Sequence, residues 1–210
     1  MKITVTISAL LLFAGSVLWF GYREISKKDP ANAIEIEFMK GEEHPAGIPE
    51  LGEAPDFNLI GIDSARVSLD TYAGKVLVVD FIFTTCAGPC PKMTKNMATL
   101  HEKFKAETNF RIASVTVDPD YDTPQVLYQY AKSFQADTSQ WHFLTGSIEA
   151  IENFAVKGLK LPGDVHVATH SSYFVLIDPK GQLRGFYNGL KTDEVEKLAG
   201  HVQILLKELS

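Results

Sequence analysis

The sequence predicts an α/β domain in which helices flank a central mixed β-sheet. The chain contains segments with the alternating pattern and β-branched residues of strands and segments with helical periodicity. They occur in the order β-α-β-α-β-α-β-β-α. Apart from Asp80, residues 76–83 are uniformly apolar, which is typical of a central strand covered on both faces. Both cysteines of the chain follow this strand directly, so all its thiol chemistry lies at one strand–helix junction.

The elements can be justified in chain order from periodicity and from their boundary residues. We expect a hairpin at residues 57–60 and 66–69 and a central strand at 76–83. Two further strands are expected at 110–117 and 141–144, and a second hairpin at 173–177 and 183–187. We expect helices at residues 92–104, 124–134, 147–156 and 192–209, and an edge strand at 34–38. Asp122-Thr123-Pro124 supplies a cap and an N1 proline, while Thr192 or Asp193 would cap the last helix. With a cysteine pair where the first central strand meets its helix, this order predicts a thioredoxin-like fold.

The composition permits a full core and excludes one class of partner. The chain has 210 residues, 45% of them hydrophobic, which suits one domain with extensions. Its net charge is −6, and no basic stripe interleaved with aromatic residues occurs. We therefore exclude nucleic acid as a partner.

An apolar stretch near the N-terminus predicts a membrane anchor. Residues 3–20 carry no charge and have about the length that crosses a bilayer. The small residues at 14–16 lie inside the apolar run, so cleavage there would expose apolar residues, and we expect an uncleaved anchor. We assign 1–22 to the anchor, 23–48 to a tether and 49–210 to the thioredoxin-like domain. The basic residues after the run would favour a cytoplasmic domain, whereas the signal-anchor pattern, which we follow, places it outside the cytoplasm.

Cys86 and Cys90 are separated by three residues and adjoin a helix N-terminus. This spacing allows the sulfurs to form a disulfide or to share a soft metal ion. The helix dipole favours thiolates, so we expect both pKa values to be lowered. The alternative is a purely structural disulfide, which in so small a ring would contribute only about 2 kcal/mol. Redox or metal chemistry is the better interpretation.

Among six histidines, His170 is the candidate third ligand. In thioredoxin-like folds the segment just before the second hairpin packs against the cysteine loop, and His170 occupies that place. One imidazole with two thiolates suits copper, although a structural role for His170 stays open. The other histidines are read as tether, surface or core residues: His44, His101, His142 and His201. Secondary candidates near the site are His166, Met93, Met97 and Asp118, each with a loop, core or turn role as the simpler reading.

Four motifs together resemble the Sco/SenC family of copper-binding, thioredoxin-like assembly proteins. They are FTTCAGPCP at 83–91, VDP at 117–119 with DTP at 122–124, WHFLTG at 141–146, and His170 followed by LIDPKG at 176–181. The resemblance covers most of residues 53–208. The chain differs from many members of the family because it lacks a carboxylate between the cysteines. Its region between residues 158 and 170 is also shorter than in members that carry an insertion there.

The resemblance implies a site and a role. Cys86, Cys90 and His170 would bind Cu(I) or Cu(II), and the protein would deliver copper to, or assemble, the binuclear copper centre of cytochrome c oxidase. Its partner would be the copper-bearing subunit of the oxidase or another copper-site protein. The family's single N-terminal transmembrane segment matches the expected anchor, which would place the domain in the periplasm or extracytoplasmic space.

Three other functions are weighed against copper delivery. A thiol-disulfide oxidoreductase would keep a partner's copper-ligand cysteines reduced, with Cys86 attacking and Cys90 resolving. A peroxiredoxin-like peroxidase ranks lower, because no arginine lies near the loop in the sequence. An interaction module with an inert disulfide ranks last.

Overall fold

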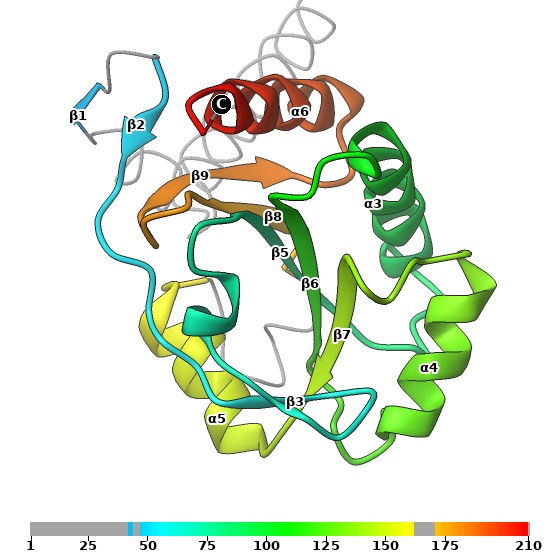
Figure 1. Cartoon of the computed structure of the whole chain (residues 1–210). Helices are drawn as coiled ribbons and strands as arrows, with labels where there is room; N and C mark the ends of the chain where they lie inside the picture. The colour runs from blue at the N-terminus through cyan, green and yellow to red at the C-terminus, as the bar shows by residue number, and fades with distance from the viewer. Residues whose placement is uncertain (1–41, 44–46, 162–170, 210) are drawn as a thin grey trace, which may run out of the picture. The chain divides into compact units, whose positions relative to one another are not determined.

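A mixed seven-stranded sheet forms the centre of the described part of the chain (Figure 1). The computed structural model describes residues 42–43, 47–161 and 171–209, all within the compact unit Phe38–Ser210. The expected anchor, the strand at 34–38, His44, His166 and His170 lie outside the described residues. Within the described ranges, no helix is long and apolar enough to cross a membrane.

The strand order is β4-β3-β7-β6-β5-β8-β9. In chain order the strands are β3 (Leu59–Gly61), β4 (Arg66–Val67), β5 (Val76–Ile82), β6 (Phe110–Thr116), β7 (Trp141–Thr145), β8 (Tyr173–Ile177) and β9 (Leu183–Asn188). β5, β6 and β7 run parallel, and the outer pairs are antiparallel. Every residue of β5 is buried, which confirms the prediction of a central strand covered on both faces. A separate pair, β1 (Glu42–Glu43) with β2 (Pro49–Glu50), was not predicted.

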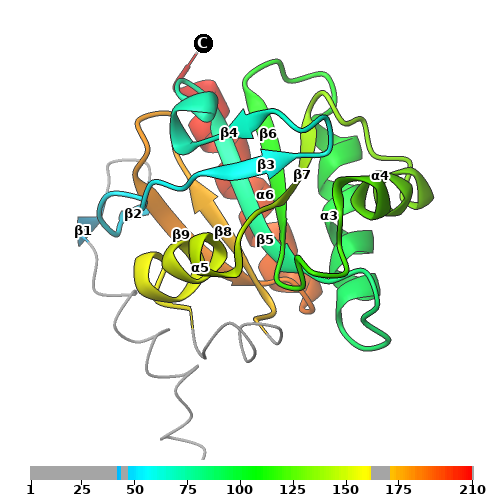
Figure 2. The same cartoon turned by 90° about the horizontal axis from the view of Figure 1, so that it is seen from below.

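Helices cover both faces of the sheet, as expected because the side chains on both faces of β5 are buried (Figures 1 and 2). Val76, Val78 and Ile82 join a core with α3 (Cys90–Phe104), α4 (Pro124–Ser133) and α6 (Thr192–Lys207). The intervening β5 side chains point to the other face, where they pack with α5 (Ile148–Glu152), the π-helical turn η2 (Asn153–Gly158) and the 3₁₀ turn η1 (Leu69–Tyr72). The α/β mixed sheet with flanking helices is therefore confirmed.

Of the two helix caps predicted from the sequence, one is confirmed and one is wrong. Thr123 caps α4 as expected, its hydroxyl accepting a hydrogen bond from the Val126 N–H. The predicted caps of α6 are wrong, because Lys191 occupies the N-cap and makes no side-chain bond. Acidic residues in the first turn of α6 instead place negative charge at the positive end of the helix dipole.

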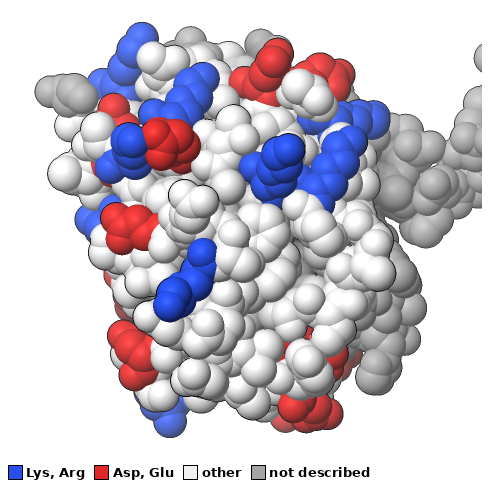
Figure 3. Space-filling view, turned by 90° about the vertical axis from the view of Figure 1, so that its right-hand side faces the viewer, with Lys and Arg blue, Asp and Glu red and all other residues white. Residues whose placement is uncertain are grey.

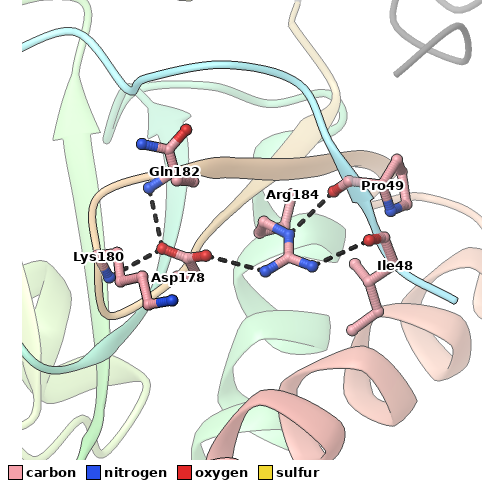
Figure 4. A network of polar contacts seen from close by, with 6 residues as sticks. All are labelled: Ile48, Pro49, Asp178, Lys180, Gln182 and Arg184. Atoms are coloured by element: carbon pink, nitrogen blue, oxygen red, sulfur yellow. Dashed lines mark hydrogen bonds and ion pairs between the residues drawn. The ribbon is translucent and has the colours of Figure 1, made fainter. Parts of the chain in front are cut away.

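A buried ion pair joins the second hairpin to the segment that leads into the sheet (Figure 4). Arg184 Nη1 donates to Asp178 Oδ2 at 2.9 Å, and both side chains are almost fully buried. Arg184 also donates to the carbonyls of Ile48 and Pro49, each at 2.9 Å. The other oxygen of Asp178 accepts the N–H groups of Lys180 and Gln182 in the hairpin turn. One guanidinium thus fixes β2 to β9, at the end of the sheet away from the cysteines.

Figure 3 shows the side of the domain that carries α3 and α4. Its basic and acidic side chains are interspersed, and uncharged residues cover much of it. A continuous basic stripe of the kind that binds phosphate backbones does not cross this face.

Candidate thiol and metal site

Both cysteines lie at the junction of β5 and α3: Cys86 is in the connecting loop, and Cys90 is the first residue of α3. β5 ends at Ile82 and α3 begins at Cys90, with Pro89 as its N-cap and a proline in its first turn. Cys90 is 3% exposed and Cys86 is partly exposed, and both are free thiols. The Cys86 N–H donates to the Phe83 carbonyl at 3.2 Å, which folds the loop back toward the strand. The pair therefore has one sulfur that solvent and partners reach and one sulfur beneath it.

The pKa values of the two thiols move in opposite directions. Burial opposes ionisation of Cys86, but hydrogen bonds to its sulfur from the Cys90 thiol and from the N–H groups of Cys90 and Gly88 lower its pKa. Burial raises the pKa of Cys90, and its hydrogen bond to Cys86 raises it further. The expectation that both pKa values are lowered is wrong for Cys90, because deeper burial outweighs the helix terminus. Cys86 is therefore the thiol of the pair that ionises more readily.

Asp80 is a fully buried carboxyl on β5, on the face that α3 covers. Ser114 Oγ donates to its Oδ1 at 2.5 Å and accepts from Trp141 Nε1 at 2.9 Å. Its Oδ2 has no hydrogen-bond partner among the described residues. Burial raises the pKa of Asp80 from its ordinary value of 3.8 to about 7, although the Ser114 bond acts in the opposite direction. In the sequence analysis Asp80 was noted only as the one charged residue in an apolar run.

Asp80→Asn is expected to remove a pH dependence from the stability of the fold. The folded protein holds the Asp80 proton more tightly than the unfolded chain does. Its contribution is therefore fully present below the ordinary pKa and is lost as the pH rises through about 7. Urea unfolding of the native protein should show this contribution falling by about 2–3 kcal/mol between about pH 5 and about pH 8, and the Asn variant should lack that fall.

The comparison of the two proteins isolates the carboxyl from other titrating groups. Burial lowers the pKa values of His101, His142 and His201, so their contributions are lost as the pH falls, with the opposite sign. These histidines are present in both proteins and cancel in the difference. Parallel stability profiles for the native protein and Asp80→Asn would contradict the assignment.

The structure tests several of the positions predicted for the histidines and methionines. His101 is buried against Trp141, with ring centroids 5.6 Å apart, so the prediction of a surface position is wrong. His142 and His201 contact tyrosine hydroxyls, which agrees with structural roles. Met93 and Met97 are buried in the core, as the simpler reading predicted. No group of three or more His, Cys, Asp or Glu side chains within the described ranges could hold a metal ion, and His170 stays a prediction.

The acidic residue that reaches the cysteine loop is Asp122, which sequence reasoning missed. It is fully buried and accepts hydrogen bonds from the N–H and the hydroxyl of Thr84 and from Thr116 Oγ1. Asp118, the residue named from the sequence, has its backbone in the turn: its N–H donates to Thr116 Oγ1 and its carbonyl accepts the Asp122 N–H. The DTP motif predicted only a helix start. No pattern in the neighbouring sequence indicated that Asp122 contacts Thr84.

The fold and the site together define a class, a thioredoxin-like protein with two free thiols just after its central strand. The particular family follows from sequence. The family model described as SCO1/SenC matches residues 48–207, so the chain belongs to the SCO1/SenC family. The SCO1 protein homolog of Bacillus subtilis is 36% identical over 157 residues, which are 72% of this chain and 81% of that protein.

Solved structures agree with this membership. BsSco, described as a member of the Sco family of cytochrome c oxidase assembly proteins with a disulfide switch, is 35% identical with a TM-score of 0.66. That alignment covers 74% of this chain and 94% of BsSco. Yeast Sco1 with copper bound is 23% identical with a TM-score of 0.58, over 72% of this chain and 93% of yeast Sco1, which shows the shared fold.

Proposed function

We propose that this protein binds copper through Cys86 and Cys90, with His170 as the third ligand, and serves assembly of the binuclear copper centre of cytochrome c oxidase. The observation that carries the proposal is a pair of free, adjacent sulfurs, of which Cys86 is partly exposed and ionises readily. Membership of the SCO1/SenC family and the copper bound to yeast Sco1 support the choice of metal. Residues 1–22 would anchor the chain, with the domain outside the cytoplasm.

The chemistry of the two sulfurs fits copper as cargo. Soft thiolates suit Cu(I), and an imidazole nitrogen added to two thiolates extends the site to Cu(II). The lowered pKa of Cys86 eases its ionisation, whereas the raised pKa of Cys90 means that this thiol gives up its proton only when metal binds, because coordination displaces protons from ligands. Binding is therefore expected to weaken as the pH falls.

The same pair supports a second function, thiol-disulfide exchange. The Cys86 thiolate attacks one sulfur of a partner's disulfide, whose other sulfur leaves as a thiolate and takes a proton. The Cys90 thiolate then attacks Cys86 in the mixed disulfide, which releases the reduced partner and leaves Cys86 and Cys90 oxidised. The opposite pKa directions and unequal exposure of the two thiols favour these roles. Oxidation of the pair would also remove both thiolate ligands and release copper, so the two functions are chemically linked.

A copper titration of the reduced full chain in mild detergent tests the proposal. We expect one copper per chain and a Cu(II)–thiolate charge-transfer band. His170→Ala should weaken Cu(II) binding more than Cu(I) binding, because the imidazole matters most for the harder ion. His44→Ala serves as the matched control and should bind like the native protein.

Two outcomes would change the assignment. Unchanged Cu(II) affinity and spectrum in His170→Ala would remove that residue from the ligand set. No stable copper complex, together with a readily reduced Cys86–Cys90 disulfide, would favour the oxidoreductase function.

A further inference from the structure

The peptide group that joins Phe83 to Thr84 is held at both of its ends. Its N–H donates to Asp122 Oδ2 at 3.1 Å, and the Thr84 hydroxyl donates to Asp122 Oδ1. Its carbonyl oxygen, which belongs to Phe83, accepts the Cys86 N–H at 3.2 Å. Because a peptide group is planar, holding its N–H also sets the direction of its carbonyl. Asp122 therefore acts on Cys86 through one rigid group.

The preceding amide connects the same segment to the other cysteine. Burial raises the pKa of the Cys90 thiol, and the Phe83 backbone acts against that rise. Residues 83 and 84 thus contact Cys86 through a carbonyl and Asp122 through an N–H, and the Phe83 backbone also affects the pKa of Cys90. Movement of this short segment would change the surroundings of both thiols together.

Asp122 is also held by contacts with the sheet and with the start of α4, outside the cysteine loop. Thr116 Oγ1 donates to Asp122 Oδ2 at 2.5 Å, and Thr116 is paired in parallel register with Ile82, the last residue of β5. The Asp122 N–H donates to the Asp118 carbonyl at 2.8 Å, and the following residue caps α4. A carboxylate that only accepts hydrogen bonds matches the three donor groups that face it. Asp122 is therefore held by residues of regular structure, whereas Cys86 lies in a loop.

We propose that Asp122 is a positioning residue that fixes the Phe83–Thr84 peptide and thereby sets the geometry of Cys86 relative to Cys90. This inference deepens the proposed function, because it rests on the thiol pair being the functional site. It differs from a purely stabilising role for a buried carboxylate. A stabilising role predicts a loss of stability alone, whereas positioning predicts a change in thiol reactivity in the folded, metal-free protein.

The test measures alkylation of Cys86 by iodoacetamide at about pH 6, with the modified residue identified by peptide mapping. At this pH the supply of thiolate limits the rate. In Asp122→Asn an amide N–H₂ group faces hydrogen-bond donors, so the Thr84 contacts weaken and the loop loosens around the thiolate. We expect alkylation to slow by about three- to tenfold, and Thr84→Val to behave alike. Thr84→Ser, which keeps the hydroxyl, should restore the native rate.

Asp178→Asn is the matched control, because it also alters a buried, hydrogen-bonded carboxylate, at the opposite end of the sheet. It should lower the melting temperature and leave alkylation of Cys86 unchanged. Equal alkylation rates in Asp122→Asn and the native protein would overturn the proposal, as would a rate change in Asp178→Asn of the same size. The assay uses no copper, so a failure of copper binding and a failure of this inference give separate results.

Discussion

Cys86→Ser is expected to reduce the affinity for Cu(I) by about a thousandfold or more. A serine hydroxyl stays protonated near neutral pH and is a hard ligand, so the variant offers Cu(I) one soft sulfur where the native pair offers two. Loss of a group that merely orients a metal ligand already reduces affinity by about 10- to 100-fold, and loss of the ligand itself should exceed that. Competition with a Cu(I) chelator of known affinity measures the effect.

The two cysteine variants separate coordination from thiol exchange. Cys90→Ser should lose Cu(I) affinity to a similar extent, because both sulfurs are ligands in the proposal. In thiol exchange the variants differ, since Cys90→Ser retains the reactive thiol and should trap a mixed disulfide through Cys86. Thr85→Ser, a change at an exposed loop position between Thr84 and Cys86, is the matched control and should bind copper normally. Native-like Cu(I) affinity in Cys86→Ser would refute the ligand assignment.

The local features of the site could be predicted from the sequence. An unbroken apolar run specifies a strand covered on both faces, and β5 is fully buried. Proline at the start of a periodic segment marks a helix N-terminus, and α3 begins at Cys90. Both signals lie within a few residues of the element they define. The position of the cysteine pair at a strand–helix junction followed from them.

The electrostatics of the site depend on contacts between distant residues, which local patterns do not encode. The opposite pKa directions of the thiols follow from the deep burial of Cys90 and from the hydrogen bonds that reach the sulfur of Cys86, although both residues belong to the same short motif. Asp122 reaches Thr84 across 38 residues of chain, and Arg184 reaches Ile48 across 136. The sequence showed Asp122 as the start of a helix and Arg184 as one residue of a hairpin, because those are their local roles.

Arg184→Met is expected to lower the free energy of unfolding by about 3–5 kcal/mol, since it leaves the buried Asp178 carboxylate without its charged partner. Two backbone carbonyls, of Ile48 and Pro49, lose their donors in the same substitution. Arg184→Lys should recover only part of the loss, because an ammonium group lacks the planar fork that reaches one carboxylate and two carbonyls together. Urea unfolding near neutral pH measures each variant.

A double-mutant cycle decides whether the ion pair or simple loss of packing explains the effect. If the stranded charge dominates, Asp178→Asn combined with Arg184→Met should be less destabilised than the sum of the two single variants, by an interaction energy of about 1–3 kcal/mol. Additive losses would mean that the guanidinium acts through its contacts with β2 and not through Asp178. In either case the copper titration should be unchanged at a temperature where the variants are folded, because this network lies at the end of the sheet away from Cys86.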